Sequence, residues 1–177
     1  MNTSSSRRFG WMPAAALVFL AGCTTTQAYF VPGDDPAGVI IGEIGDASST
    51  IDLAIYTFTH EGIRDALYDA ASVRGVEVRI CADEVQTATI DSQRRNLKTL
   101  RDDAGAQVRV ATGNGGTHMH HKFLVVDEHS VLTGSFNYTW SANTSNDENL
   151  LALTSPPLAE DFSAAFEELW SRCEELE

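Results

Sequence analysis

The chain has 177 residues and carries 12 Lys and Arg against 25 Asp and Glu, which gives a formal net charge of −13 at pH 7. This charge argues against proteins that hold DNA or RNA through the phosphate backbone, because such binding depends on Lys and Arg. The length suits one domain with a substantial hydrophobic core, and no internal repeat divides it.

The first segment has the pattern of a secretory signal. Arg7 and Arg8 precede an apolar run that is too short to span a bilayer as a helix. Leu20-Ala21-Gly22-Cys23 resembles the cleavage site of bacterial lipoproteins, which implies a signal peptide over residues 1–22 and a lipid anchor on Cys23 in the cell envelope. Thr24 favours the outer over the inner membrane. The alternative is a plain secretory signal with an incidental cysteine, and the paired arginines are weak evidence for twin-arginine export.

After a short tether at residues 23–28, residues 29–177 form one predicted domain. Pro36 after Asp35 predicts a helix with Asp35 as its N-cap, and Thr59 is expected to cap the next helix. Strand, helix and strand in succession predict a parallel pair of strands. The expected elements are a weak helix over 35–44, a strand at 51–58, a helix through 63–70, a strand at 76–80, a helix at 91–102 and a strand at 107–111.

A β-hairpin carrying polar side chains follows. The apolar run 123–126 predicts a strand, residues 127–130 a turn, and 131–133 a returning strand. Because side chains alternate along a strand, His120 and Lys122 project from one side, as do Ser135 and Asn137 beyond Gly134, which allows close backbone approach. The hairpin therefore brings an imidazole, an ammonium, a hydroxyl and an amide to one place, which suits a phosphate.

The spacing H-x-K-x4-D-x6-G-S-x-N, which runs from His120 to Asn137, resembles the signature of the phospholipase D superfamily. The resemblance covers residues 29–177 and implies an α/β fold, an α-β-α sandwich with a mixed, largely parallel sheet. It implies a histidine nucleophile at His120, a covalent phosphohistidine, and no cofactor or metal. Lys122, Ser135 and Asn137 are expected to bind the phosphate, and Asp127 to orient other groups. Glu148 is expected to accept a hydrogen bond from His120.

The leaving oxygen needs a proton while His120 is bonded to phosphorus, so the reaction requires a separate acid. The sequence has no second H-x-K, and the chain resembles the single-motif branch of the superfamily. That resemblance implies a homodimer with its active site across the twofold axis, in which His120 of the partner acts as the acid.

Two other interpretations of the histidine cluster stay open. His118, His120 and His121 could hold a metal, although His121 points away along a strand and no acidic or cysteine ligand is near in sequence. The His-Lys pair could also be purely structural if Glu148 or Asp127 neutralised Lys122.

The expected reaction is hydrolysis of phospholipid headgroups, and the alternative is a metal-independent endonuclease that acts on DNA or RNA. The acidic charge and the lipid anchor favour phospholipid. A surface lipoprotein that only binds phosphorylated ligands is a third interpretation. Residues 113–116 form either a mobile lip over the substrate or a long turn.

A final helix after Pro156-Pro157 is expected to pack an apolar stripe against the sheet. Cys81 and Cys173 could form a disulfide outside the cytoplasm or remain small buried hydrophobic residues. The stripe consists of Phe162, Phe166, Leu169, Cys173 and Leu176.

Overall fold

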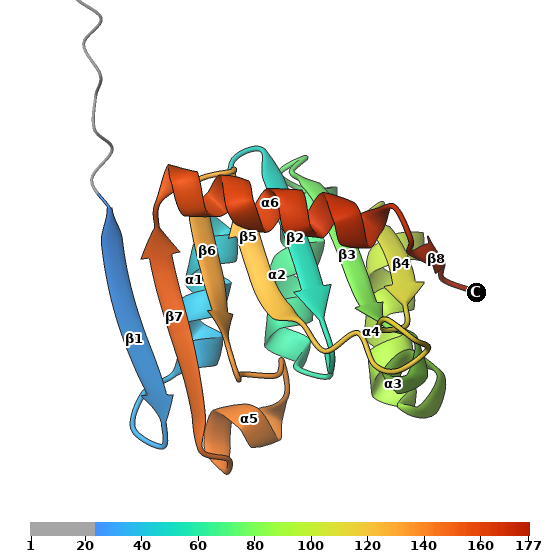
Figure 1. Ribbon diagram of the computed structural model, residues 1–177, viewed down its shortest axis with the longest axis horizontal. Helices are drawn as coiled ribbons and strands as arrows, with labels where there is room; N and C mark the ends of the chain where they lie inside the picture. Colours follow the sequence, from blue (N-terminus) through green and yellow to red (C-terminus); the bar gives the residue numbers. More distant parts are fainter. Residues whose placement is uncertain (1–23) are drawn as a thin grey trace, which may run out of the picture.

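The computed structural model describes residues 24–177, so the predicted signal peptide and Cys23 lie outside the described residues. Eight strands form a single sheet in the order β1-β7-β6-β5-β2-β3-β4-β8 (Figure 1). The strands are β1 (Thr25–Val31), β2 (Thr50–Ile55), β3 (Glu77–Asp83), β4 (Gln107–Ala111), β5 (Lys122–Val126), β6 (Ser130–Gly134), β7 (Glu148–Thr154) and β8 (Glu174–Glu175). The helices are α1 (Pro36–Asp46), α2 (Glu61–Ser72), α3 (Glu84–Thr89), α4 (Asp91–Asp102), α5 (Trp140–Thr144) and α6 (Pro156–Trp170).

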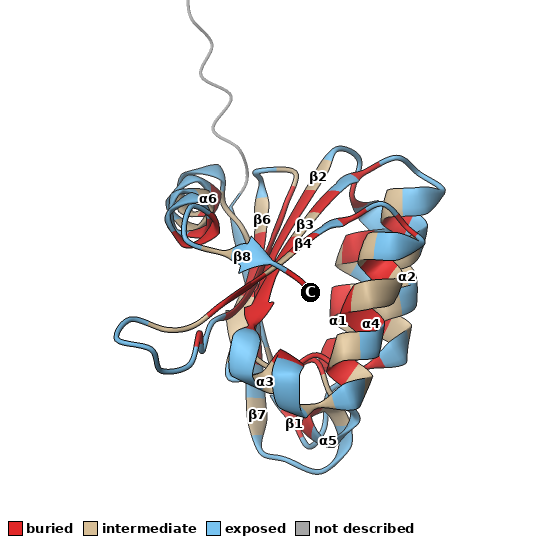
Figure 2. Ribbon diagram, turned by 90° about the vertical axis from the view of Figure 1, so that its right-hand side faces the viewer, coloured by how far each residue is buried: buried red, intermediate tan, exposed pale blue. Residues whose placement is uncertain are grey.

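Helices cover both faces of the sheet, as the α-β-α layering requires. Helices α1, α2 and α4 lie on one face and α6 crosses the other (Figures 1 and 2). In β2, Ile51, Leu53 and Ile55 belong to the larger core under α1, α2 and α4, whereas Ala54 faces α6, because alternate side chains point to opposite faces. Within residues 24–177, no helix combines the length and apolar character that crossing a bilayer requires.

The sheet is mixed as expected, but its parallel share is smaller than predicted. Only β3 has parallel neighbours on both sides, β2 and β4, and the other five strand pairs are antiparallel. Helical crossovers connect the parallel strands, whereas β5, β6 and β7 follow one another without a crossover back to the same end of the sheet. The alternation of strands and helices in the first half of the chain therefore does not extend to the second half.

The segment expected to be a tether at residues 23–28 is mostly strand. Strand β1 begins at Thr25 and pairs with β7 along its whole length, at the edge of the sheet. Threonine is β-branched and favours extended backbone, which explains why a Thr-rich segment joins a sheet edge. The folded domain thus begins a few residues earlier than predicted.

The caps of two helices can be compared with the prediction. The side chain of Asp35 caps α1 as expected. His60 rather than Thr59 caps α2, because its Nδ1 accepts the amide of Ile63 at 3.3 Å. The amides of Thr59 and His60 both donate to the carbonyl oxygen of Tyr138, at 2.8 and 2.9 Å. These two bonds hold the start of α2 against the segment that follows β6.

Helix α6 ends earlier than the apolar stripe suggested. Phe162, Phe166 and Leu169 pack on the sheet, but the helix stops at Trp170, and Cys173 and Leu176 lie beyond it. Cys173 forms a disulfide with Cys81 of β3. The pairing that the sequence left open is therefore present, and it links the end of α6 to the middle of the sheet.

Candidate active site

The H-x-K and G-S-x-N residues lie at one end of the sheet, where β2, β3, β4 and β6 finish and β5 begins. Lys122 is the first residue of β5 and pairs with Ile55, the last residue of β2. Strand β2 lies between a parallel and an antiparallel neighbour. The end of β2 and the start of β5 therefore lie side by side at the same end of the sheet. Tyr56 and the segment leading to Lys122 come together there.

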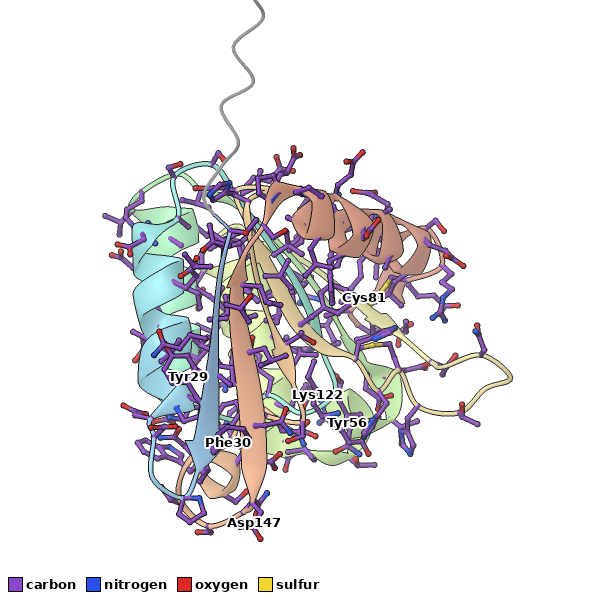
Figure 3. All side chains as sticks on the ribbon, turned by 60° about the vertical axis from the view of Figure 1, so that its left-hand side comes forward. Tyr29, Phe30, Tyr56, Cys81, Lys122 and Asp147 are labelled. Atoms are coloured by element: carbon purple, nitrogen blue, oxygen red, sulfur yellow. A yellow bond between two sulfur atoms is a disulfide. The ribbon has the colours of Figure 1, made fainter. Side chains whose placement is uncertain are left out.

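His120 and Lys122 are in direct contact. The Nζ atom of Lys122 lies 3.2 Å from Nδ1 and 3.4 Å from Nε2 of His120, and it donates to the His120 carbonyl oxygen at 3.0 Å. The ring of Tyr56 lies beside both, with its centroid 4.4 Å from that of His120 and 5.1 Å from Nζ. Figure 3 shows Tyr56 and Lys122 at this end of the sheet. Lys122 is only 8% exposed, whereas His120 is open to solvent. The structure thus places an accessible imidazole against a buried ammonium.

The pKa values of both groups are lowered. Burial is the larger cause for His120, and the charge of Lys122 lowers the pKa further. Burial also lowers the pKa of Lys122, while the carboxylate of Glu148 acts in the opposite direction. A lowered pKa favours the neutral imidazole, which keeps the lone pair that a nucleophile needs.

Glu148 lies near the site, but it contacts a different partner from the one expected. It accepts one hydrogen bond from the hydroxyl of Ser135 and a second from Asn146 Nδ2 at 3.0 Å. Ser135 in turn accepts the backbone amide of Asn149 at 3.0 Å. No hydrogen bond joins Glu148 to His120, so the tautomer of His120 is not set in this way here.

The other two residues of the G-S-x-N segment differ in their surroundings. At Gly134 a Cβ atom would overlap the carbonyl oxygen of Asn149, which explains why glycine stands there. The side chain of Asn137 is half-buried, and its Oδ1 has no hydrogen-bond partner among residues 24–177. Its predicted role in binding phosphate stays a prediction.

Asp127 lies at the opposite end of β5 from the site. Five residues of strand separate it from Lys122, about 17 Å. Its carboxylate accepts from the amides of Ser48, Ser49 and Thr50 at 2.8 to 2.9 Å and from both serine hydroxyls. The expectation that Asp127 orients groups in the site stays a prediction, and the contacts seen in the structure are with another part of the chain. Asp127 holds the loop before β2 against the β5–β6 turn.

Three residues that the sequence did not assign to the site also lie there. Tyr56 contacts His120 and, at 5.3 Å between ring centroids, His118. Nδ1 of His118 lies 3.3 Å from Oδ1 of Asp83, a carboxylate with no exposed surface at the end of β3. Asp83 also accepts the amide of Met119 at 2.8 Å. The sequence could have suggested Asp83, since it ends a buried strand.

The possible metal site can be compared with the geometry. Within the described part of the chain, no group of three or more His, Cys, Asp or Glu side chains is arranged to hold a metal ion. The ring of His121 turns toward Phe123 instead, with their centroids 5.4 Å apart.

The site residues fall within a known family pattern. The family described as "Cardiolipin synthase, PLD-like domain" matches residues 40–170, which include every residue of the H-x-K and G-S-x-N segments. The chain belongs to the phospholipase D-like family. The resemblance seen in the sequence is thereby confirmed.

Relatives and solved structures agree with this family. A mitochondrial cardiolipin hydrolase of Chlamydomonas reinhardtii is 35% identical over 127 residues, which are 72% of this chain and 54% of the relative. A phospholipase D of Rickettsia prowazekii is 32% identical over 130 residues, or 72% and 60% of the two chains. The structure of Nuc from Salmonella typhimurium, a phospholipase D family member, covers 86% of this chain and 97% of Nuc with a TM-score of 0.79 at 29% identity. The chain spans about half the length of the curated relatives it matches.

Proposed function

We propose that the protein is a phosphodiesterase that removes headgroups from phospholipids through a covalent phosphohistidine at His120. One observation carries the proposal, namely the 3.2 Å contact between the exposed His120 ring and the buried Lys122 ammonium. Burying an ammonium is costly unless an anion accompanies it, so this position is suited to receive a phosphate. Relatives named cardiolipin hydrolase and phospholipase D support this class of ester.

The chemistry proceeds in two displacements at phosphorus. First a ring nitrogen of His120 bonds to phosphorus while the bond from phosphorus to the headgroup oxygen breaks, and an acid protonates that oxygen. Water then attacks phosphorus and gives up a proton, and the bond from phosphorus to His120 breaks. This step frees His120 and leaves the phosphate on the lipid product. Lys122 and the Ser135 hydroxyl donate to the non-bridging oxygens, where negative charge grows. The Ser135 hydroxyl donates to Glu148 in the structure, so it must rotate to donate to the phosphate.

The acid comes from a second copy of the chain in this proposal. The sequence contains one H-x-K, and a twofold contact would set His120 of one protomer opposite His120 of the other. His120 of one protomer attacks phosphorus. His120 of the other protonates the leaving oxygen and later accepts the proton from water. His120 is exposed, just before the start of the central strand β5, as such a contact needs. A monomer would then be inactive.

Phospholipid is favoured by the surface beside Ser135. Phe30 of β1 is 59% exposed and pairs in register with Asn149, whose amide donates to Ser135. Leu151, on the same face of β7, is 36% exposed. This apolar surface would accept acyl chains, whereas a nucleic acid would meet a chain with 25 acidic residues against 12 basic ones.

The proposed location is the bacterial cell envelope, with Cys23 as the lipid anchor and the outer membrane as the favoured site. The disulfide between Cys81 and Cys173 supports an oxidising compartment, because cytosolic thiols are kept reduced. Mass spectrometry of the protein purified from membranes would show an acylated N-terminal Cys23. A mature protein whose N-terminal residue is not Cys23 and carries no acyl chain would contradict the proposed anchor.

The proposed function can be tested with purified wild type, His120→Asn and Ser135→Ala. Each is offered phosphatidylglycerol micelles, single-stranded DNA and RNA in parallel, with and without a chelator. We expect hydrolysis of the lipid, loss of all turnover in His120→Asn, and a roughly ten- to hundredfold lower kcat in Ser135→Ala. Wild type quenched during turnover in an alkaline denaturant should carry phosphorus on His120, because a phosphorus–nitrogen bond is labile in acid.

Several results would reject parts of this proposal. Cleavage of DNA or RNA without lipid hydrolysis would make the protein a nuclease. Loss of activity with chelator would contradict a mechanism built on side chains alone. Mixing His120→Asn chains with wild type should lower activity per wild-type chain, and unchanged activity would rule out the shared site.

A further inference from the structure

Lys122 is a buried cation whose contacts are unusual for an ammonium group. It is 8% exposed, and among residues 24–177 no carboxylate forms a salt bridge with it. The carboxylate that acts on it from a greater distance, Glu148, is hydrogen-bonded to Ser135 and Asn146. Burying a cation without an anion is costly. Another group in the site must therefore stabilise the ammonium before a phosphate arrives.

The ring of Tyr56 lies where such a group is needed. The Nζ atom of Lys122 lies over this ring, 5.1 Å from its centroid, which is within the range of a cation–π interaction. The same ring packs against the imidazole of His120, with centroids 4.4 Å apart and planes tilted by 54°. The negative face of an aromatic ring attracts an ammonium more strongly where water is excluded. Tyr56 is thus in contact with both residues of the H-x-K segment.

The ammonium faces the ring of His120 rather than one of its lone pairs. Nζ lies 3.2 Å from Nδ1 and 3.4 Å from Nε2, whereas a hydrogen bond to one nitrogen would place it much closer to that nitrogen than to the other. Nζ also donates to the His120 carbonyl oxygen at 3.0 Å. The carbonyl and the Tyr56 ring therefore hold the ammonium, and the in-plane lone pair of the imidazole is left free to attack phosphorus.

Buried hydrogen bonds fix the segment that carries Tyr56. Gln93 of α4 has no exposed surface, and its Oε1 accepts the amide of Phe58 at 2.8 Å. Its Nε2 donates to the carbonyl oxygen of Tyr56 at 3.3 Å. The ring of His118 also stands against that of Tyr56, at 80° and with centroids 5.3 Å apart. Both the backbone and the ring of Tyr56 are therefore held in place.

We propose that Tyr56 is a positioning residue for the reaction at His120, because its ring face is the partner of the Lys122 ammonium and holds it against the imidazole until a phosphate binds. The phosphate oxygens then become the partner of Lys122. This role of Tyr56 rests on the proposed function, since the phosphate is the one that reacts at His120. It requires the aromatic face and not the phenolic hydroxyl. A tyrosine that only filled space would require neither.

The charge of Lys122 can be measured directly. The sequence has two lysines, Lys98 and Lys122, so NMR of full-length protein labelled with 13C at the lysine Cε resolves each one against pH without substrate. The titratable side chains that act on Lys122 are His120, Glu148 and Tyr56. Burial lowers the pKa of Lys122 and Glu148 acts in the opposite direction. Loss of the ring face removes a contact that favours the charged form, so the midpoint of Lys122 should fall further.

Two substitutions separate the ring face from the space that it fills. Tyr56→Phe should keep the wild-type midpoint of Lys122, and Tyr56→Leu should lower it by about one pH unit while that of Lys98 stays unchanged. Tyr68→Leu is the matched control, because Tyr68 is a partly buried tyrosine of α2 that packs against the core. An unchanged or raised midpoint in a folded Tyr56→Leu protein would overturn the proposal.

Fluorinated phenylalanine at position 56 gives a second series that keeps the shape of the ring. Each added fluorine weakens the negative potential of the ring face, so the midpoint of Lys122 should fall stepwise as fluorine is added. This series decides the question if Tyr56→Leu does not fold. A midpoint that does not depend on the number of fluorines would show that the ring face does not stabilise the ammonium.

Turnover of short-chain phosphatidylglycerol connects the role of Tyr56 to catalysis. Tyr56→Phe should keep kcat within about threefold of wild type, and Tyr56→Leu should lower kcat roughly ten- to hundredfold, because the imidazole and the ammonium are no longer held together. A wild-type kcat in a folded Tyr56→Leu protein would overturn Tyr56 as a positioning residue. If wild type hydrolyses no lipid but the midpoints of Lys122 shift as expected, the proposed function is rejected and the contact of Tyr56 with the ammonium stands.

Discussion

Asp127 offers the sharpest separation of stability from catalysis in this protein. It belongs to the H-x-K-x4-D motif, yet its carboxylate accepts five hydrogen bonds from Ser48, Ser49 and Thr50 at the end of β5 far from His120. We therefore predict that replacing Asp127 destabilises the fold and spares the catalytic step. A role in orienting the site would have the opposite signature.

The size of the loss follows from the hydrogen bonds. The two serine hydroxyls are exposed and can turn to water, so their bonds contribute little. Three backbone amides remain, at about 1 kcal/mol each. Asp127 also has a φ of 52°, which costs an alanine about 1 kcal/mol more than an asparagine. Asp127→Ala should thus lower the free energy of unfolding by about 4 kcal/mol, and Asp127→Asn by about 1 to 2 kcal/mol.

Urea unfolding at pH 7 measures these losses, and kcat/KM is taken at a temperature where both variants are folded. We expect Asp127→Asn to keep at least half of the wild-type kcat/KM. A folded Asp127→Asn protein of wild-type stability that has lost activity a hundredfold would refute the structural role and return Asp127 to the chemistry.

The same carboxylate makes stability depend on pH. Burial acts to raise the pKa of Asp127, but the hydrogen bonds from Thr50, Ser48 and Ser49 outweigh it, so the pKa lies below the ordinary value of 3.8. A lowered folded pKa means that the stabilisation is complete above the unfolded pKa and is lost as the pH falls below it. Wild type should lose more stability between pH 5 and pH 2 than Asp127→Asn does.

Three further predictions concern the site and the core. Lys122→Met should abolish turnover yet leave the melting temperature unchanged or higher, because it removes a buried ammonium, and a variant that melts lower would contradict this. The acid limb of the kcat/KM profile should fall below pH 6.5, since burial and the Lys122 charge lower the pKa of His120 and the protonated ring has no lone pair; a limb above pH 6.5 would exclude His120 as the titrating nucleophile. Because the disulfide has a sequence separation of 92, replacing Cys81 and Cys173 by alanine should lower the free energy of unfolding by about 4 kcal/mol, and equal stability in urea would show that the bond does not form.

The sequence determined much of the fold and the position of the chemistry. Helix α4 and strand β4 coincide with their predicted ranges, because a strong helical or alternating period is a local property. The alternation of two was also enough to set His120 and Lys122 on one side. Strands β1, β7 and β8 and helices α3 and α5 were not predicted. The exposed edge strand β1 and the short elements α3, α5 and β8 have weak periodicity, and their existence depends on pairing with distant segments.

Tertiary structure decided which polar side chains meet. Asp127 follows Lys122 of the motif by only five residues, but strand β5 places it at the far end of the sheet. Its hydrogen-bond donors there come from residues 48–50. Glu148 reaches Ser135 because β6 and β7 pair, and Asp83 reaches His118 because β3 ends where the chain enters β5. A sequence records the order of these groups, whereas contacts between them depend on strand order and direction, which many distant residues set together.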